Sequence, residues 1–296
     1  MSKWNCTIDP KDSGLSIKEI LRRDFSFSSR MMTKFKQNNC IKLNGEPVKL
    51  YIIPKPGDEL DIELPDEKSS FPPENIPIIP VFEDGDLLII DKPAGFVVHP
   101  TKGHPAHTIA NGLARYIIDT GQNFKIRFIN RLDMDTSGLL VIAKSAHCQE
   151  EISRQMKNGQ VVKKYIAVVN GVVKDDSGAV DAPIGRPDPG SIARSVTEGG
   201  HQSTTFYEVL KRYDKGFSLL ELRLKTGRTH QIRVHMSYIG HPVAGDSLYG
   251  GENVLLIERQ ALHAFYISFY HPITGKFTEV SADLPKDIKR LIAKIE

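Results

Sequence analysis

A proline-rich stretch constrains the fold of this chain more than any other sequence feature. Residues 65–80 hold five prolines in sixteen positions. Proline fixes the backbone angle φ and supplies no amide donor, so this stretch predicts neither a helix nor a central strand. It is typical of a fairly stiff linker. We therefore expect a small N-terminal domain at residues 1–64, a linker at 65–80 and a larger body at 81–296.

Helix and hairpin signals follow one another in the small N-terminal domain. Ser16 and Glu19 have the spacing of a capping box, which predicts a short helix over residues 16–23. We expect a second helix directly after it. Asn44-Gly45 separates two short runs as a hairpin turn does, and residues 58–64 alternate with the period of a half-buried strand. The order predicts two helices followed by a small sheet.

Basic residues outnumber acidic ones in the middle of this domain. Eight Lys and Arg lie between Lys18 and Lys49, against three Asp and Glu. Such an excess fits a polyanionic partner such as RNA. It equally fits helix faces that are merely solvated, and charge alone leaves both interpretations open. As candidate RNA-binding residues we take the basic side chains of the two expected helices, Arg22, Arg23, Arg30, Lys34 and Lys36.

This N-terminal segment resembles the alpha-L RNA-binding domain, which also occurs in a ribosomal small-subunit protein. The resemblance rests on the basic helix pair, on the strand and turn at 41–45, and on Pro56-Gly57-Asp58 before a final strand. It covers about the first 64 residues. It implies a small α/β domain that binds RNA, mainly through phosphate-directed contacts. The alternative is a packing domain without a ligand.

Short apolar strands predominate in the body. Strands outnumber helices and do not alternate with them regularly, which argues against a doubly wound fold. A helix is expected over 147–156, with Ser145 as its cap. We predict an α+β fold in which a mixed, mainly antiparallel sheet is flanked by helices and loops. The runs with strand character are 87–90, 139–143, 165–169, 206–210 and 217–224.

Composition argues against several classes of protein. No apolar run approaches the ~20 residues that span a bilayer, and the N-terminus lacks an apolar signal core. Three scattered cysteines without a Cys-x-x-Cys pair make a disulfide framework or a zinc site improbable, which fits a reducing cytoplasm. No Walker loop or Gly-x-Gly-x-x-Gly is present, so we expect no nucleotide cofactor. The histidines lack metal-site spacing, so we expect no metal.

The stretch Arg131-Leu-Asp-Met-Asp-Thr-Ser-Gly138 carries the densest chemistry of the chain. It places two carboxylates, two hydroxyls and a glycine directly before an apolar strand. These residue types favour a turn, and a turn beside a rigid strand commonly presents catalytic groups. Arg131 is suited to keeping a nearby carboxylate ionised. An ordinary solvated turn explains the same residues, so the stretch alone leaves its role open.

This stretch resembles the signature of the RluA-type pseudouridine synthases of large-subunit ribosomal RNA, roughly His-Arg-Leu-Asp-x-x-Thr-Ser-Gly. The resemblance continues in order along the body, from about residue 82 to residue 284. Several blocks in one order are far more specific than one short motif. One position departs from the pattern, because Asn130 stands where the family usually has histidine. Asparagine does not titrate near neutrality, so an acid–base role there is in doubt. The matching blocks are 91–100, 163–165, 226–235, 240–246, 262–264 and 271–275.

The resemblance implies that residues 81–296 form a pseudouridine synthase domain that needs no cofactor. It places the catalytic aspartate at Asp133, with Arg131 as an active-site support. Tyr165 corresponds to the tyrosine that packs against the target base, as a flat platform for a flipped base. Arg233 corresponds to the active-site arginine. Arg228 is a further candidate for RNA binding, since guanidinium groups suit phosphates.

The predicted partner is therefore structured RNA, with large-subunit ribosomal RNA as the substrate that the resemblance implies. We expect a cytoplasmic monomer with no membrane association. Two other functions stay open from the sequence. One is a non-catalytic RNA-binding or ribosome-assembly protein, for which the basic N-terminal domain and Asn130 speak. The other is an aspartate-based hydrolase of a small substrate, which the basic clusters disfavour.

Overall fold

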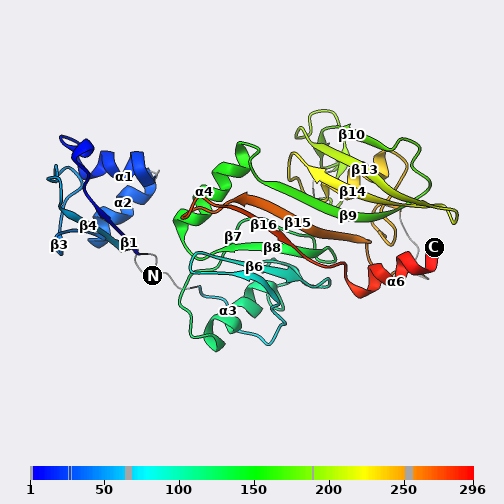
Figure 1. Ribbon diagram of the computed structural model, residues 1–296. Coiled ribbons are helices and arrows are strands. Elements are labelled where there is room, and N and C mark those ends of the chain that lie inside the picture. Colours follow the sequence, from blue (N-terminus) through cyan, green and yellow to red (C-terminus); the bar gives the residue numbers. More distant parts are fainter. Residues whose placement is uncertain (1–2, 26, 28, 64–68, 189, 251–255) are drawn as a thin grey trace.

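The computed structural model describes residues 3–25, 27, 29–63, 69–188, 190–250 and 256–296. Figure 1 shows a small N-terminal unit in blue and a larger body built on one long sheet, coloured cyan to red. Buried apolar side chains gather in one cluster within the small unit and in three clusters within the body. Each unit therefore has a core of its own.

The small unit consists of helices packed on a four-stranded sheet with the order β1-β4-β2-β3. Its elements are β1 (Lys3–Thr7), the 3-10 helix η1 (Pro10–Asp12), α1 (Ile17–Phe25), α2 (Ser29–Asn38), β2 (Ile41–Leu43), β3 (Glu46–Pro47) and β4 (Glu59–Glu63). The expected capping box is present, since the Glu19 amide donates to the Ser16 hydroxyl and the Ser16 amide donates to the Glu19 carboxylate. Asn44 and Gly45 have φ angles of 53° and 85°, as a tight hairpin turn requires.

The body is organised around a ten-stranded sheet whose main order is β10-β13-β14-β9-β15-β8-β6-β5. In addition β16 pairs with β15, β7 pairs with β8, and β11 (Ile184–Gly185) and β12 (Ser195–Val196) form a separate pair. Among the described strands, β8 and β15 run parallel and the other pairs are antiparallel. The predicted mixed, mainly antiparallel α+β fold is confirmed. The strands of the large sheet are β5 (Pro80–Glu83), β6 (Leu87–Lys92), β7 (Arg127–Phe128), β8 (Ser137–Ala143), β9 (Val162–Asn170), β10 (Ser177–Asp181), β13 (Thr204–Tyr213), β14 (Phe217–Leu224), β15 (Leu262–Tyr270) and β16 (Phe277–Ser281).

Helices cover both faces of the half of the sheet that contains β6 and β8 (Figure 1). Leu88 and Ile90 of β6 pack with α3, whereas Leu87 and Ile89 pack with α4 on the opposite face. Side chains alternate along a strand, so a strand buried on both faces is a continuous apolar run. The helices of the body are α3 (Ile109–Asp119), α4 (Ala146–Lys157), α5 (Gln231–Tyr238) and α6 (Lys286–Ile295).

The described part of the proline-rich segment lies against the body. The Asn111 side chain donates to the carbonyl of Pro72, and Ile76 is buried in the cluster around α3. Residues 69–79 contain no helix or strand, in agreement with the proline content. This segment therefore follows the surface of the body over its described length, and the division at residues 64 and 81 stays a prediction.

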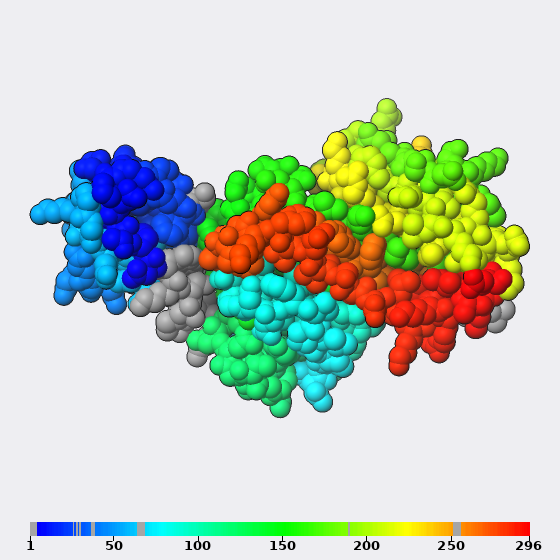
Figure 2. Space-filling model, viewed as in Figure 1, coloured from blue at the N-terminus to red at the C-terminus, as the bar shows by residue number. Residues whose placement is uncertain are grey.

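The small unit touches the body at α4. The rings of Phe27 and His147 meet edge to face with centroids 4.8 Å apart, and Ala146 packs against the core of the small unit. Figure 2 shows this unit in blue at one end of the molecule and α6 in red toward the other. Within the described residues, the helices are all too short or too polar to cross a lipid bilayer.

Candidate active site

The loop between β7 and β8 holds Asp133, and hydrogen bonds from Lys92 and Gly95 fix this loop. The carbonyl of Met134 accepts hydrogen bonds from Lys92 Nζ at 2.8 Å and from the Gly95 amide at 3.0 Å. Lys92 is fully buried and also donates to the carbonyls of Pro93 and Phe96. Burial lowers the pKa of Lys92 to about 7. Lys92 thereby ties the end of β6 to the Asp133 loop.

Asn130 braces the other end of the same loop. Its side chain donates to the carbonyl of Leu139 and accepts from the amide of Val141, both in β8, at 3.1 and 2.8 Å. Both hydrogen-bonding groups of the amide are thus used by the backbone. The residue that departs from the family pattern therefore holds the turn against the strand.

Gly138 allows the loop to lie directly on β15. Its φ is 113°, and a Cβ atom there would come within 2.3 Å of the Ala264 carbonyl oxygen. A side chain at this position is excluded by both backbone conformation and space. Glycine at position 138 thus lets β8 start immediately after Asp133 while it pairs with β15.

Arg233 on α5 binds Asp133 from the opposite side of the site. Its Nη1 lies 3.1 Å from Asp133 Oδ2, and its Nε and Nη2 form a two-pronged pair with Asp246 at 2.6 and 2.8 Å. Burial on its own lowers the pKa of Arg233, but the hydrogen bonds and charges of Asp246 and Asp133 outweigh burial and raise it. Asp246 thus fixes the guanidinium that faces Asp133.

A second close backbone approach positions Asp246. The preceding residue, Gly245, has a φ of 78°, and a Cβ atom there would meet the Arg259 carbonyl oxygen at 2.1 Å. Asp246 itself is 1% exposed and also accepts from the amide of Leu248. Arg233 is 7% exposed, so the pair is shielded from water and its geometry is well defined.

Tyr165 lies in the middle of β9 and is 6% exposed. Burial raises the pKa of its phenol, and the charge of Asp133 raises it further, which places the two side chains in one site. Leu132, next to Asp133, packs in the same apolar cluster as Tyr165. The structure therefore brings together Asp133, Tyr165 and Arg233, three residues that the sequence separates by up to 100 positions.

Two further residues belong to this site although the sequence did not single them out. The ring of Tyr249 lies 5.0 Å from the Arg233 guanidinium, and His230 Nε2 lies 3.9 Å from Asp133 Oδ1. His230 lies within the matching block 226–235, and Tyr249 lies just after the block 240–246. The sequence holds no other indication of these two residues. The N-cap position of α5 is occupied by His230 in a left-handed conformation.

Other predicted support residues lie outside this cluster. Arg131 is exposed, and none of the ion pairs among the described residues involves it. Among the described residues, Arg233 of α5 is the arginine that pairs with Asp133, and the support role of Arg131 stays a prediction. Arg228 is exposed, and its amide donates to Gln231 at the start of α5.

The basic residues of the small unit differ in their burial and in their contacts with other side chains. Arg23 is engaged with Asp12 and Asp24, and Arg22 donates to Ser29. Lys36 is exposed, and Lys34 is partly buried. The side chain of Arg30 lies outside the described residues. The RNA-binding roles of Arg22, Arg23, Arg30, Lys34 and Lys36 stay predictions, and Arg23 is the one most fully occupied by carboxylates.

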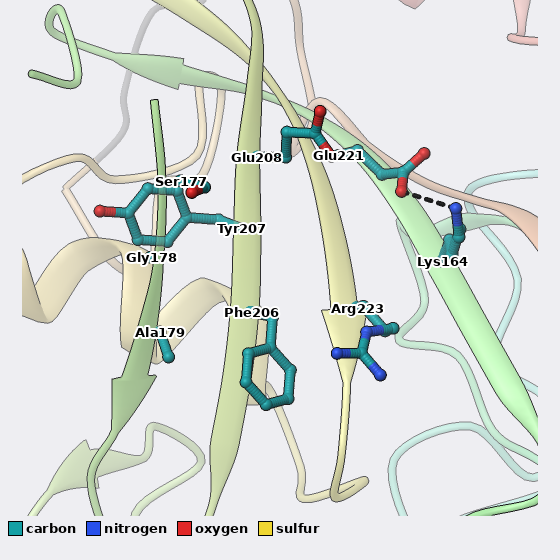
Figure 3. A pocket seen from close by; sticks show the side chains of 9 residues that line it. All are labelled: Lys164, Ser177, Gly178, Ala179, Phe206, Tyr207, Glu208, Glu221 and Arg223. Atoms are coloured by element: carbon teal, nitrogen blue, oxygen red, sulfur yellow. Dashed lines mark ion pairs between the residues drawn. The ribbon is translucent and has the colours of Figure 1, made fainter. Parts of the chain in front are cut away.

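A groove of about 570 Å³ lies on the sheet face opposite Tyr165 (Figure 3). Tyr165 is paired with Leu222, whereas the adjacent Lys164 is paired with Arg223, so Lys164 and Arg223 point to the other face. There Lys164 forms an ion pair with Glu221, and Arg223 stacks on Phe206. The basic run from Arg223 to His235 is therefore divided between two faces, and only part of it borders the Asp133 site.

Asp84, Asp86 and His271 form a separate cluster, with atoms suited to metal binding within 4.8 Å of one another. His271 Nδ1 accepts the amides of Ile273 and Thr274, which leaves the ring proton on Nε2, 2.9 Å from Asp84. A protonated Nε2 donates to the carboxylate and offers no lone pair. We therefore interpret the cluster as a hydrogen bond that links the β5–β6 turn to the β15–β16 turn.

Comparison with known proteins bears directly on this site. A family model described as RNA pseudouridylate synthase matches residues 86–238, which include Asp133, Tyr165 and Arg233. The chain is 40% identical over 273 residues to the uncharacterized RNA pseudouridine synthase YlyB of Bacillus subtilis, covering 91% of this chain and 90% of that one. It is 35% identical to the ribosomal large subunit pseudouridine synthase D of Pasteurella multocida, over 90% of this chain and 86% of the relative.

Solved structures agree with the sequence matches. Human RNA pseudouridylate synthase domain containing 1 superposes with a TM-score of 0.57 at 26% identity, covering 76% of this chain and 96% of that one. Human RNA pseudouridylate synthase domain containing 4 superposes with a TM-score of 0.60 at 24% identity, covering 73% and 92%. The second likeness bears on the fold only.

Proposed function

Since the chain belongs to the RNA pseudouridylate synthase family, we propose that it isomerises uridines of large-subunit ribosomal RNA with Asp133 as the catalytic carboxylate. The family model and the relatives identify the chain as an RNA pseudouridine synthase. The observation that carries the role of Asp133 is its geometry. It is a partly exposed carboxylate held by a buried Arg233, whose orientation is fixed in turn by Asp246.

The reaction breaks the bond between ribose C1′ and uracil N1 and forms a bond between C1′ and C5. The base gains a hydrogen at N1 and loses one at C5, so no atom is added to the RNA and no electron is transferred. A uridine in a duplex must first leave the stack, at a cost of a few kcal/mol. The protein's task is therefore to hold the flipped base and to stabilise the ribose while the base turns.

One carboxylate serves this reaction in either of two routes. In the first, Asp133 attacks C1′ and holds the ribose covalently while uracil rotates. In the second, Asp133 removes the C2′ proton as the C1′–N1 bond breaks, which gives a glycal and free uracil; C5 then bonds to C1′ while Asp133 returns the proton to C2′. In both, Arg233 orients the carboxylate, because its Nη1 donates to Asp133 Oδ2 at 3.1 Å. Tyr165 supports the uracil ring from β9.

Large-subunit ribosomal RNA is the substrate that the relatives support, since one of them is named a ribosomal large subunit pseudouridine synthase D. The test compares pseudouridine in total RNA with and without the gene, mapped by carbodiimide modification and primer extension. We expect one or more sites to disappear from large-subunit RNA and to return when the wild-type gene is restored. Loss confined to another RNA would contradict the proposed substrate, and an unchanged map would contradict the activity in the cell.

The remaining proposals concern the enzyme as a whole. We propose that residues 1–64 add phosphate-directed affinity for RNA, with Arg22, Lys34 and Lys36 as contacts, and that the enzyme works as a cytoplasmic monomer. The support is the basic excess around α1 and α2 and the separate core of that unit. Such contacts add affinity and orientation without reading the sequence.

A further inference from the structure

His230 has a strained backbone conformation directly beside Asp133. Its φ of 57° lies in the left-handed region, which costs a non-glycine residue free energy and is concentrated at functional sites. Its side chain is 13% exposed, and its Nε2 lies 3.9 Å from Asp133 Oδ1. This distance is longer than a hydrogen bond. The ring and the carboxylate thus lie next to each other without being hydrogen-bonded.

The other ring nitrogen is held by Tyr249. His230 Nδ1 lies 2.7 Å from the Tyr249 hydroxyl, and the two rings meet edge to face. The same hydroxyl accepts the amide of Arg194 at 2.8 Å. Its own hydrogen is therefore free to be donated to Nδ1, which leaves the imidazole proton on Nε2. The nearby Asp133 carboxylate favours a proton at that position, so both neighbours select one tautomer.

Burial is the main influence on the protonation of the ring. Burial lowers the pKa of His230, and the cations Arg233 and Arg194 lower it further, while Asp133 and Asp246 oppose them. A neutral ring with its proton on Nε2 is a hydrogen-bond donor aimed at the oxygen of Asp133 that Arg233 leaves free. Contacts of this kind are often long in the free enzyme and shorten when substrate binds.

We propose that His230 is a positioning residue for Asp133, whose Nε2–H donates to Asp133 Oδ1 in the RNA complex while Tyr249 holds the ring in the required tautomer. Arg233 then holds Oδ2 and His230 holds Oδ1, so that the carboxylate has one fixed orientation toward the ribose. This inference rests on the proposed catalytic role of Asp133. It assigns a task to the strained residue before α5 and to the hydroxyl of Tyr249.

The first test uses glycine, which adopts the left-handed conformation without strain. We expect His230→Gly to fold, to keep the KM for RNA and to lose about 100-fold in kcat, the order of loss for a misplaced catalytic group. His107→Gly is the matched control, because His107 also has a left-handed φ, 56°, but an 86% exposed side chain. We expect wild-type kcat from the control. Wild-type kcat in His230→Gly would overturn the proposal.

Two milder variants separate positioning from packing. His230→Gln places an amide donor near the position of Nε2, so we expect kcat to recover to within about 10-fold of wild type, since a neutral donor is restored. Tyr249→Phe keeps the ring over Arg233 but releases Nδ1, so we expect kcat to fall while KM is unchanged. Full activity of Tyr249→Phe, or no recovery in the folded Gln variant, would contradict the assignment.

The pH profile is a readout that a packing role would leave unchanged. In acid, protonated His230 forms an ion pair with Asp133 and withdraws the carboxylate, so wild-type kcat should fall. Because the pKa of His230 is lowered, this fall should be centred below the ordinary histidine pKa of about 6.5. His230→Gln has no group to titrate there and should keep its kcat to lower pH. The same acid limb in both proteins would overturn the proposal. An active Asp133→Asn would instead end the proposed role of Asp133, so the two failures are distinguishable.

Discussion

Asp246 holds Arg233 in place, and Arg233 in turn orients the Asp133 carboxylate. We predict that Asp246→Asn lowers the free energy of unfolding by about 3–5 kcal/mol, because it leaves the charge of Arg233 without its buried partner. It should also lower kcat, since the guanidinium no longer has a fixed orientation. The measurements are denaturant unfolding and the rate of pseudouridine formation.

The matched control for Asp246 is an exposed pair of the same chemistry. Arg115 binds Asp119 with both carboxylate oxygens at 2.8 Å, but both side chains are about half exposed. Asp119→Asn should change stability by less than about 1 kcal/mol and leave kcat unchanged. If Asp246→Asn and Asp119→Asn changed the free energy of unfolding and kcat equally, burial would not be the reason for the effect of the Asp246–Arg233 pair.

Because burial lowers the pKa of Lys92, we expect the free energy of unfolding to depend on pH. Its pKa is about 7 in the folded protein and about 10.4 in an unfolded chain. Between these values the unfolded chain binds more protons, so stability gains from this residue as pH rises from 7 toward 10. We expect the difference in unfolding free energy between wild type and Lys92→Met to shift in favour of wild type from pH 7 to pH 9. A constant difference would contradict the buried state of Lys92.

The two faces of β9 give adjacent lysines different tasks. Lys163 lies on the face of Tyr165 with its Nζ near Gly227, and burial lowers its pKa, whereas Lys164 is paired with Glu221 in the opposite groove. We predict that Lys163→Ala weakens RNA binding and reduces its salt dependence by about one ion, and that Lys164→Ala does neither. Filter binding across a salt series measures both. Equal slopes for the two variants would contradict this assignment.

Strand and helix patterns predicted much of the fold, and the misses have physical causes. The apolar runs of β6, β8 and β14 and the capped helix α4 carry their signal locally, so the sequence predicted them. The helix α3 holds Asn111 and Gly112 in its first turns, and these are weak helix formers. The strand β1 is short and polar, and it gains its order from pairing with β4. Pairing partners of this kind are set by tertiary structure.

The candidate site was predictable to different degrees for each residue. The assignments of Asp133, Tyr165 and Arg233 came from motif blocks, whose order can be recognised in a single sequence. Asp133 pairs with Arg233 of α5, 100 positions away in the sequence, and the support role of the nearby Arg131 stays a prediction. The roles of Lys92, His230, Tyr249 and Asp246 depend on contacts between segments far apart in the chain, and no local pattern encodes these.

At the scale of the whole molecule, the position of the small unit predicts where charge matters for RNA. Lys36 is exposed on α2, and Lys289 is exposed on α6 toward the other end of the molecule (Figure 1). We predict that Lys36→Glu weakens RNA binding several-fold with kcat unchanged, because a phosphate contact is replaced by repulsion. Lys289→Glu changes the net charge equally and should leave affinity unchanged. Equal losses would indicate a general charge effect and contradict binding by the small unit.

The central claim is that Asp133 performs the chemistry, and the release of hydrogen from C5 tests it most directly. RNA carrying tritium at uracil C5 loses that label to water when pseudouridine forms. Asp133→Asn removes the charge and keeps the shape, while Asp135→Asn makes the same change two residues further along the same loop. We predict no release above background for Asp133→Asn, with unchanged RNA affinity, and wild-type release for Asp135→Asn. Tritium release by a folded Asp133→Asn enzyme at the wild-type rate would contradict the central claim.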